Sequence, residues 1–551
     1  MTNKDLANVI FPDITKTIED YKQIYPKREL KEGEKVTRFA PSPTGFMHLG
    51  GFYQAIIDYV LAKNSNGIFY LRNEDTDQKR EVKEAVELIM KTLNHYDVKP
   101  DEYEYEGKII GNYGPYIQSE RKEIYHAFIK YLIEIDRAYP CFCTKDEVDE
   151  IRAKQEKYKA RIGYYGRYAK CRNLSIAEKI EKIKNGEEYV IRFRSLGNNE
   201  KRFFFEDLVR GTLSLPENDQ DIVIMKSSDR LPTYHFAHFV DDFLMGTTHV
   251  VRGEEWLPSV PIHIELFKAF DAKPPKYIHT PLIVKKEGNS VRKLSKRKDP
   301  EATMSYYEEN GYPTLAVIES LMTIINSNYE EWHDKNPEKS YLEFPFSPKK
   351  MSSSGGALYD IEKLNNISKN IISKMSAKEV YSDLYNWSEK YDKEFFELIS
   401  KYKEYTINIL NIEREQKKPR KDYENYKAIK PQIWYMYDEL FNKKEKEYDF
   451  LNITDKDEIK LILNTYIDKY YNDNDDKDTW FNKVKELSEE LGYASNMKEY
   501  KEDPSKFKGN VADISTVIRV AITTSSMTPD LYEILRLLGK DRIKSRIELF
   551  N

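Results

Sequence analysis

Residues 38–51 read Arg38-Phe39-Ala40-Pro41-Ser42-Pro43-Thr44-Gly45-Phe46-Met47-His48-Leu49-Gly50-Gly51. An extended run over 36–40 enters this segment, its two prolines cannot continue a helix, and Gly45 permits a sharp reversal. Apolar residues then recur at helical spacing from Phe52, and Gly67 ends the helix just before a second extended run over 68–71. The pattern predicts a strand–helix–strand unit of a parallel α/β sheet, whose first turn offers amide groups and a helix N-terminus to an anion such as phosphate.

The glycine pair and the histidine before it allow two interpretations. Without a Cβ atom, Gly50 and Gly51 let a nucleotide lie directly against the backbone, and His48 can donate to a phosphate oxygen. Alternatively, His48 is an ordinary histidine at a helix start and the glycines serve packing. Residues 48–51 alone favour this second interpretation.

The complete segment resembles the first signature of class I aminoacyl-tRNA synthetases, in the form with glycine in place of the second histidine that is typical of glutamyl-tRNA synthetases. The resemblance implies that ATP binds over this turn, at Thr44, His48, Gly50 and Gly51. It also implies that His48 and the two glycines belong to the catalytic residues.

Composition limits the class of protein. The chain has 551 residues, which is enough for about three to five compact units. Its formal net charge of −5 gives no global attraction to nucleic acid, so any RNA contact must come from local basic patches. The sequence has no apolar run that could span a bilayer, and its N-terminus lacks the hydrophobic core of a signal peptide. We therefore expect a cytoplasmic protein without membrane contact.

Cys141, Cys143 and Cys171 are the three cysteines of the sequence, too few for a disulfide-stapled secreted scaffold. A Cys-x-Cys pair followed by a third cysteine is typical of a zinc knuckle, because thiolates bind Zn²⁺ tightly. The spacing offers no clear fourth ligand, since Asn173 is a poor ligand and the tyrosines at 164, 165 and 168 are weak candidates. Structural zinc and buried, reduced cysteines both remain open.

Several positions near the ends of predicted strands suit an acidic amino acid. A planar guanidinium gives a carboxylate two parallel donors, so Arg38 and Arg252 could converge on two carboxylates, with Tyr234 adding a hydroxyl. Glu74 follows the second strand, where open α/β sheets bind ligands, and could hold an ammonium group. Each has a simpler interpretation: either arginine could pair with an internal acid such as Glu254, and Glu74 could belong to a solvated helix start.

The family resemblance implies glutamate at these positions, with Arg38, Ser42, Glu74, Tyr234, His238 and Arg252 as its contacts. The similar glutaminyl-tRNA synthetases typically have Glu and Asn in place of Ser42 and Thr44, and they lack an arginine at the position of Arg252. A neutral amide gains nothing from a second guanidinium, so the charge pattern favours glutamate. His238 stands where a histidine is common in glutaminyl enzymes, which leaves its role open.

A second basic segment, Ser290-Val291-Arg292-Lys293-Leu294-Ser295-Lys296-Arg297-Lys298, follows far downstream. Such a run is usually a solvated loop. Its Lys-x-Ser-Lys order, however, resembles the class I mobile loop that covers the phosphates of ATP. When pyrophosphate leaves, negative charge shifts onto the β and γ phosphates, and flexible ammonium groups can follow it. The resemblance implies catalytic roles for Lys293, Ser295 and Lys296, with Lys296 as the main phosphate contact.

The resemblance covers the chain from about residue 35 and implies a Rossmann-like parallel-sheet catalytic domain with an α+β insertion, then a stem-contact module and an all-α anticodon-binding domain. We expect an N-terminal extension of unknown purpose (1–34), the first catalytic half (35–140), a connective insertion that receives the acceptor end of tRNA (141–221), the second catalytic half (222–280), the mobile loop and stem-contact module (281–365), and the helical anticodon-binding domain (366–551).

The predicted function is ATP-dependent ligation of L-glutamate to the 3′ end of tRNA(Glu), through glutamyl-adenylate and with Mg²⁺, by a monomeric enzyme. Three alternatives are a glutaminyl-tRNA synthetase, a tRNA-modifying glutamyl transferase, and a non-catalytic tRNA-binding protein on a synthetase scaffold. The modifying enzymes lack a helical C-terminal domain, and a scaffold protein is expected to lose one of the two signatures. Whether tRNA(Gln) is also charged is left open, as are the residues that read the anticodon.

Overall fold

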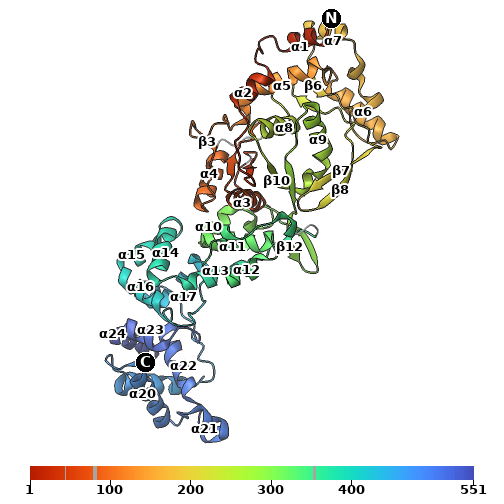
Figure 1. The fold of residues 1–551 in the computed structure, drawn as a ribbon. Helices are drawn as coiled ribbons and strands as arrows, with labels where there is room; N and C mark the ends of the chain where they lie inside the picture. Colours follow the sequence, from red (N-terminus) through yellow and green to blue (C-terminus); the bar gives the residue numbers. More distant parts are fainter. Residues whose placement is uncertain (44, 78–83, 352–354) are drawn as a thin grey trace. The chain divides into compact units, whose positions relative to one another are not determined.

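The chain divides into two compact units in a computed structural model that describes residues 1–43, 45–77, 84–351 and 355–551. Unit 1 comprises Met1–Tyr306 and Ile318–Asp360, and unit 2 comprises Tyr307–Val317 and Ile361–Asn551 (Figure 1). The strands of the described residues all lie in unit 1, whereas unit 2 is helical. The predicted fold class is therefore confirmed, while the finer division of the chain into six segments stays a prediction.

The predicted strand–helix–strand unit is present as β1 (Val36–Phe39), α3 (Leu49–Lys63) and β2 (Ile68–Leu71). The two strands are parallel, and all four residues of β1 are buried, as in sheets that are covered on both faces. A Cβ atom at Gly67 would lie 1.9 Å from the carbonyl oxygen of Lys35. Only glycine therefore lets β2 begin so close to β1.

Four strands form a second sheet in the order β10-β11-β7-β8: His249–Gly253, Lys276–Thr280, Arg202–Asp207 and Gly211–Pro216. β10 and β11 are parallel, and β11 is parallel to β7, whereas β7 and β8 form a hairpin. The start of β10 lies beside β1, because the amide of Thr248 donates to the carbonyl oxygen of Val36 at 3.0 Å. The hairpin, which the sequence placed in the insertion, thus joins the sheet that carries Arg252.

Helix α8 (Tyr234–Leu244) lies between α5 (Lys122–Glu134) and α9 (Val260–Ala269). One face of α8 supplies Phe236 and Phe239 to the main apolar core of unit 1. The other face, at positions 234, 238, 241 and 242, repeats at helical spacing and carries polar side chains. This amphipathic pattern turns the polar face of α8 toward β1 and β2, where the site is built.

The N-terminal extension is an integral part of unit 1. Its helices α1 (Asn3–Ile10) and α2 (Ile18–Ile24) bury apolar residues in the same core. Arg28 donates to both carboxylate oxygens of Glu102, at 2.8 and 2.7 Å, and to the carbonyl oxygen of Met245 at 2.7 Å. Because Met245 follows α8 directly, this arginine ties the extension to the helix that bears the site.

The other elements of unit 1 surround these layers. They are α4 (Ala85–His95), β3 (Tyr103–Tyr105), β4 (Lys108–Ile110), β5 (Ala138–Cys141), α6 (Lys145–Lys157), α7 (Ile176–Lys184), β6 (Val190–Phe193), β9 (Val223–Met225), β12 (Ile283–Glu287), β13 (Ser290–Lys293), α12 (Tyr329–Lys335) and β14 (Ala357–Leu358). Helices α10 (Met304–Asn310) and α11 (Thr314–Ile325) contain two of the three points where the chain passes between the units, and the third lies between Asp360 and Ile361.

Unit 2 is built of short helices around a continuous apolar core that includes Trp387, Phe395 and Ile518. Its helices are α13 (Ile361–Lys374), α14 (Ala377–Tyr391), α15 (Lys393–Lys401), α16 (Lys403–Asn411), α17 (Lys430–Ile433), α18 (Asp438–Phe441), α19 (Lys456–Thr465), α20 (Lys477–Glu490), α21 (Met497–Glu502), α22 (Val511–Thr523), α23 (Leu531–Leu538) and α24 (Lys540–Ile547).

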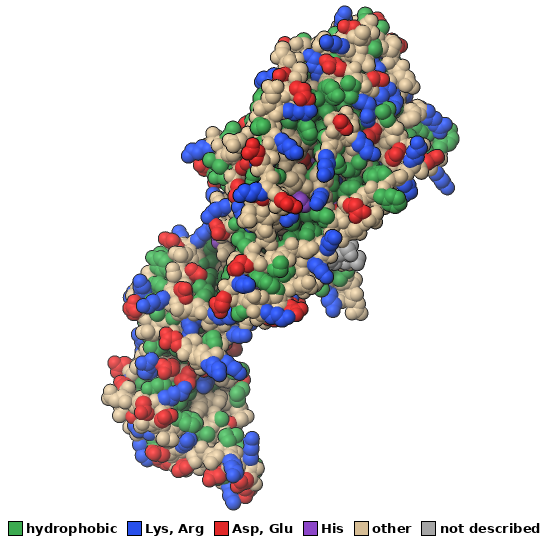
Figure 2. Space-filling model, in the orientation of Figure 1, with side chains coloured by type: hydrophobic (Ala, Val, Ile, Leu, Met, Phe, Trp, Pro, Cys, Tyr) green, Lys and Arg blue, Asp and Glu red, His purple; other side chains and the backbone are tan. Residues whose placement is uncertain are grey.

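The surface carries both signs of charge. Figure 2 shows lysine and arginine side chains interspersed with aspartate and glutamate over the visible face of each unit. This mixture agrees with the small net charge of −5. Across the described parts of the chain, no helix is both long and apolar enough to cross a membrane.

Candidate active site

His48 caps the helix that follows the first-signature turn. Its Nδ1 atom accepts the amide hydrogen of Gly50 at 2.9 Å, so the neutral ring carries its proton on Nε2. Burial, with help from the charges of Lys296 and Lys293, lowers the pKa of His48 to about 4. At neutral pH the imidazole is uncharged and presents an Nε2–H donor. The interpretation of His48 as a helix-start residue is therefore confirmed, while its role as a donor to phosphate stays a prediction.

The Lys-x-Ser-Lys segment folds back on the same turn. The Lys296 ammonium donates to the carbonyl oxygen of Phe46 at 2.8 Å, and Lys293 is the last residue of β13. Asp299, which the sequence did not single out, holds the segment in shape. It accepts two hydrogen bonds from Arg292, at 2.6 and 2.8 Å, and one from the amide of Ser295 at 2.9 Å.

The first-signature turn and the Lys-x-Ser-Lys segment both contribute residues to a pocket of about 230 Å³. Its lining residues come from the start of α3, the end of β10 and the strands before the basic loop: His48, Gly50, Gly51, Tyr53, Gln54, Gly253, Glu255, Pro281, Leu282, Ile283, Lys293 and Leu294. A Cβ atom at Gly253 would lie 2.1 Å from the Glu255 carboxylate, so a larger residue there would displace this side chain. Thr44, predicted to contact ATP, lies outside the described residues.

The predicted ligands of an acidic amino acid come together around Tyr234. Arg38 projects from β1, Glu74 follows β2, and Arg252 stands on β10. Burial raises the pKa of Tyr234, and the charges of these three residues all act on its hydroxyl, with that of Arg252 the strongest. Ser42 is exposed in the turn after β1.

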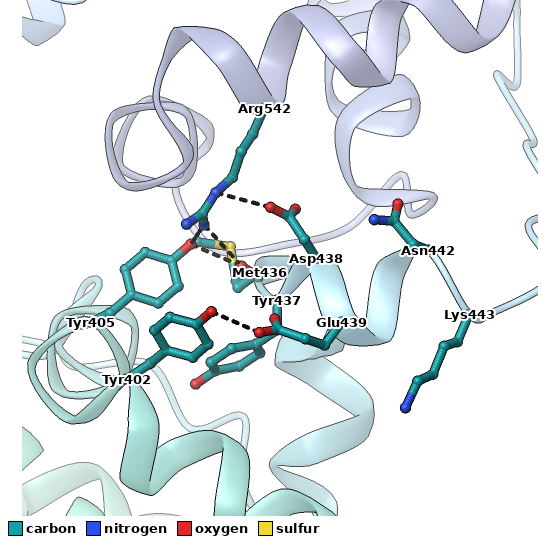
Figure 3. A pocket seen from close by; sticks show the side chains of 9 residues that line it. All are labelled: Tyr402, Tyr405, Met436, Tyr437, Asp438, Glu439, Asn442, Lys443 and Arg542. Carbon is teal, nitrogen blue, oxygen red and sulfur yellow. Dashed lines mark hydrogen bonds and ion pairs between the residues drawn. The ribbon is translucent and has the colours of Figure 1, made fainter.

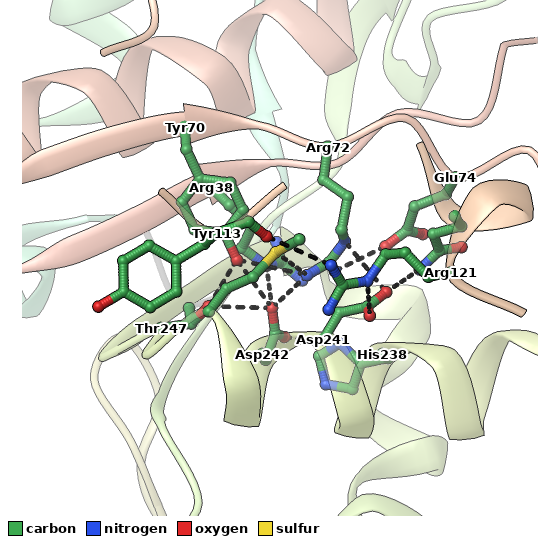
Figure 4. A network of polar contacts seen from close by, with 12 residues as sticks. Arg38, Tyr70, Arg72, Glu74, Tyr113, Arg121, His238, Asp241, Asp242 and Thr247 are labelled. Carbon is green, nitrogen blue, oxygen red and sulfur yellow. Dashed lines mark hydrogen bonds and ion pairs between the residues drawn. The ribbon is translucent and has the colours of Figure 1, made fainter. Parts of the chain in front are cut away.

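A buried ionic network supports this group (Figure 4). Arg72, at the end of β2, donates to Glu74 and to Asp242, each at 2.8 Å, and Arg38 lies 3.4 Å from Asp242. Although burial disfavours its charge, Arg72 and Arg38 hold the pKa of Asp242 well below its usual range. The neighbouring Asp241 accepts from Arg121 at 2.7 Å. The sequence signal for this network was the pair of adjacent acids within an apolar helix.

Arg252 is held differently from the other arginines of the site. Its side chain is buried, with Nε donating to Nε2 of His279 and a terminal nitrogen to Nδ1 of His263, both at 3.0 Å. The second terminal nitrogen, NH2, has no hydrogen-bond partner among the described residues. Glu254, considered from the sequence as an internal partner, pairs with Arg210 instead. Among the described residues no carboxylate pairs with Arg252, whereas Arg38 does lie beside an internal acid, Asp242, as the simpler interpretation expected.

His238 lies in the interior of unit 1, among Tyr234, Tyr277 and Asp242. Its side chain is fully buried, and its Nε2 atom lies 3.1 Å from the hydroxyl of Tyr277. Its ring stacks against that of Tyr234 with centroids 5.7 Å apart. The contact between His238 and the ligand stays a prediction, and in the structure His238 packs against Tyr234.

The three cysteines lie together, with their sulfur atoms within 4.8 Å of one another. The hydroxyl of Tyr164 lies 3.3 Å from Sγ of both Cys141 and Cys143, and Cys143 Sγ lies 3.6 Å from Cys171 Sγ. Tyr164 is buried, so its oxygen points into the cluster rather than into solvent. Sequence spacing alone could not select it from the nearby tyrosines.

Unit 2 contains a wider pocket, of about 430 Å³, between α15, α16, α18 and α24 (Figure 3). Its charged groups are satisfied internally: Arg542 pairs with Asp438 at 3.2 Å, and the Tyr402 hydroxyl donates to Glu439 at 2.7 Å. No polar group of this pocket points to a particular ligand.

Comparison with known proteins follows the division into two units. The family model for the catalytic domain of tRNA synthetases class I (E and Q) matches residues 34–336, and an anticodon binding domain model matches residues 395–550. Glutamate–tRNA ligases of Clostridium perfringens (strain SM101 / Type A) and Acetivibrio thermocellus are each 48% identical, over 553 and 549 residues, and each match covers 100% of both chains. A crystal structure of a glutamate tRNA ligase from Elizabethkingia meningosepticum CCUG26117, in complex with its amino acid, has a TM-score of 0.75 at 26% identity, covering 94% of this chain and 99% of that chain.

Proposed function

Because this chain belongs to the class I tRNA synthetases (E and Q), and within them to the glutamate–tRNA ligases, we propose that it joins L-glutamate to the 3′ end of tRNA(Glu) in the site described above. ATP and glutamate first give glutamyl-adenylate and pyrophosphate, and the glutamyl group then passes to the terminal adenosine of the tRNA. Full-length likeness to glutamate–tRNA ligases disfavours the three alternatives.

One observation carries the assignment of the amino acid: among the residues that the structure describes, no carboxylate pairs with the buried Arg252, and the group near its remaining nitrogen is the neutral hydroxyl of Tyr234. Nearby, Arg38 and Arg72 are balanced by Glu74 and Asp242. The guanidinium of Arg252 is therefore an uncompensated cation at the site. A buried charge of this kind favours a ligand that brings the opposite charge.

Glutamate fits that requirement, and glutamine does not. We assign Arg252 to the side-chain carboxylate, because only this group distinguishes the two amino acids. Arg38 then receives the α-carboxylate, Glu74 the ammonium group, and Tyr234 adds a hydroxyl. Ser42 is exposed in the adjoining turn, where it can reach the same ligand.

ATP is assigned to the pocket between the first-signature turn and the basic loop. His48 offers Nε2–H, Gly50 and Gly51 allow close approach to the backbone, and Lys296 follows the charge that shifts onto the leaving pyrophosphate. Lys293 and Ser295 support the loop. No protein nucleophile is needed, because orientation and charge stabilisation lower the barrier.

Mg²⁺ would be held by the phosphates of ATP. In the described ranges, the cysteines form the one group of three or more potential metal ligands, so no carboxylate cage for Mg²⁺ is present there. Mg²⁺ commonly uses substrate phosphates and water in this way. When bound, it neutralises phosphate charge.

We also propose that the cysteine cluster holds a structural Zn²⁺ with Tyr164 as the fourth ligand. Zinc–sulfur bonds of about 2.3 Å place tetrahedral sulfurs a little under 4 Å apart. The 3.6 Å separation of Cys143 and Cys171 fits that arrangement. Hydrogen bonds from the other two cysteines lower the pKa of Cys141, and the same hydrogen bonds raise the pKa of Cys143 and Cys171, so one thiolate is favoured in the cluster before a metal binds.

For tRNA, we propose that residues 141–221 receive the acceptor end and residues 366–551 the anticodon arm. The match of an anticodon binding domain to residues 395–550 supports the second assignment. The insertion supplies basic and aromatic side chains to a phosphate backbone, among them Arg167 and Tyr168, which lie side by side.

The experiment is ATP–pyrophosphate exchange with glutamate or glutamine, with and without tRNA, followed by charging of purified tRNA(Glu) and tRNA(Gln). We expect exchange with glutamate, not glutamine, and a glutamyl-tRNA(Glu) product. Exchange driven by glutamine would indicate a glutaminyl enzyme. Exchange with glutamate that needs no tRNA and yields no 3′-charged product would indicate the modifying enzyme, and no exchange at all a scaffold protein. Charging of tRNA(Gln) as well as tRNA(Glu) would show that the enzyme accepts both tRNAs.

A further inference from the structure

We propose that His263 and His279 set the preference for glutamate over glutamine, by holding Arg252 through uncharged acceptors so that its guanidinium keeps its full positive charge for the ligand. This inference rests on the proposed function. It concerns residues behind the site, which position Arg252 without touching the ligand themselves.

The geometry fixes the charge of both imidazoles. An arginine side chain has only donors, so the nitrogen that faces it must be an acceptor. Nε2 of His279 and Nδ1 of His263 each face a guanidinium nitrogen of Arg252 at 3.0 Å. An accepting ring nitrogen carries no proton. Each ring therefore has at most one proton, on its other nitrogen, and is neutral.

A second layer holds each ring in the required tautomer. Nδ1 of His279 lies 2.7 Å from the Asp207 carboxylate, which also accepts the backbone amide of His279 at 3.2 Å. Asp207 is itself fixed at the end of β7 by the amides of Val209 and Arg210, at 3.0 and 2.9 Å. The β7–β8 hairpin therefore places the Asp207 carboxylate beside Nδ1 of His279. The proton of His279 is held on Nδ1, and Nε2 can accept a hydrogen bond from Arg252.

The second imidazole is arranged in the same way. Nε2 of His263 lies 3.0 Å from Nδ1 of His235, so the proton of His263 points away from Arg252. His263 is fully buried. Burial also holds its pKa well below the ordinary value for histidine, and burial lowers the pKa of His279. Both observations agree with the neutral state that the hydrogen-bond directions require.

The contrast with the neighbouring arginines shows what these histidines achieve. Arg72 and Arg121 contact carboxylates directly, through Asp242 and Asp241, and Arg38 lies near Asp242 as well. A carboxylate in contact with a buried guanidinium cancels most of its field. Two imidazoles satisfy the same donors without direct contact to a negative charge, because the Asp207 carboxylate stands on the far side of the His279 ring, so more of the field remains. The positive charge of Arg252 then attracts a ligand carboxylate, whereas a neutral amide gains little from it.

A matched pair of variants isolates charge from shape. In His279→Gln the side chain can still place a neutral acceptor near Arg252, whereas His279→Glu has nearly the same shape and adds a negative charge. For each we would measure KM and kcat for glutamate, glutamine and ATP in aminoacylation. We expect His279→Glu to have a glutamate KM at least about tenfold above that of His279→Gln, and a glutamate-over-glutamine ratio of kcat/KM reduced by at least about tenfold, with similar ATP KM values.

A second pair, His263→Asn and His263→Asp, repeats the comparison at the other acceptor and decides the matter should the first pair fail to fold. Equal glutamate-over-glutamine ratios within a folded pair would overturn the inference, because a purely structural role does not depend on the added charge. A wild-type enzyme without glutamate-dependent activity would instead refute the proposed function itself. The two failures are therefore distinguishable.

Discussion

The ammonium group of Lys296 donates to the carbonyl oxygen of Phe46 at 2.8 Å, so two segments 250 positions apart in sequence meet near the pocket that we propose for ATP. The imidazole of His48 lies near Lys296, and the charge of Lys296 contributes to the lowered pKa of that histidine. The contact joins the turn after β1 to the basic loop after β13. This contact places Lys296 beside the first-signature turn, where the proposed function needs it.

Lys296→Ala should lower the rate of adenylate formation. Removing one preorganised donor to developing charge costs about 10² to 10³ in kcat, and we expect a loss in that range with little change in the KM for glutamate. Pyrophosphate exchange in the presence of tRNA measures it. The matched control is Lys298→Ala, which removes an exposed lysine of the same loop and should leave the rate near that of the wild type. Equal rates for the two variants would remove Lys296 from the phosphate site.

Asp299→Asn should disturb the loop without removing any residue that faces ATP. Arg292 pairs with the buried Asp299 at 2.6 Å and with the exposed Glu287 at 3.0 Å. Breaking a buried pair has a much larger effect than breaking an exposed one. We expect the KM for ATP to rise by about tenfold or more in Asp299→Asn and to change little in Glu287→Gln. Similar KM values in both variants would show that Asp299 does not organise the loop.

Metal content tests the cysteine cluster. The protein purified without chelator should contain one zinc per chain by elemental analysis, and Cys171→Ser should lose it, because three thiolates dominate the affinity. Tyr164→Phe should weaken retention during dialysis against a chelator. Tyr158→Phe, at an exposed tyrosine of the same insertion, is the control and should retain the metal. Zinc-free protein of unchanged thermal stability would instead identify the cysteines as buried and reduced.

The free energy of unfolding of unit 1 should fall between pH 6.5 and pH 4, because buried histidines in this unit resist protonation. Burial lowers the pKa of His126 and His249 to about 4, whereas an unfolded histidine titrates near 6.5. Between these values only the unfolded chain binds the protons, so this part of the stability is fully present above pH 6.5 and is lost as the pH falls toward 4. Each group contributes a slope of up to about 1.4 kcal/mol per pH unit.

Urea unfolding at pH 7 and pH 5 measures this effect. The wild-type midpoint should fall, and His126→Gln, whose amide can still donate to the carbonyl oxygen of Arg230, should show a shallower dependence. A midpoint that does not move between the two pH values would contradict the assignment of neutral buried histidines.

The sequence predicted the parts of the site that depend on local chemistry. Turn residues and helical spacing indicated β1, α3 and β2, and strand ends indicated Arg38, Glu74 and Arg252. The contacts it missed depend on which strands become neighbours. Asp207 meets His279 only because β7 joins β11, and Arg72 meets Asp242 across 170 positions of sequence. No local pattern encodes such a pairing.

The exposure of single side chains was equally inaccessible from the sequence. His238 shares the polar face of α8 with Tyr234, and helical spacing cannot show that Tyr277 and Asp242 enclose it. Tyr164 was one of several tyrosines near the cysteines until the fold brought its hydroxyl to their sulfur atoms. Both cases turn on packing between distant segments.

The most direct test of the account is the glutamate KM of Arg252→Gln in aminoacylation of tRNA(Glu). Removing one partner of a buried charge pair costs about 2–5 kcal/mol, so we predict a glutamate KM raised at least about 30-fold, with the ATP KM within about twofold of the wild type. A glutamate KM equal to that of the wild type would contradict the claim that Arg252 binds the side-chain carboxylate.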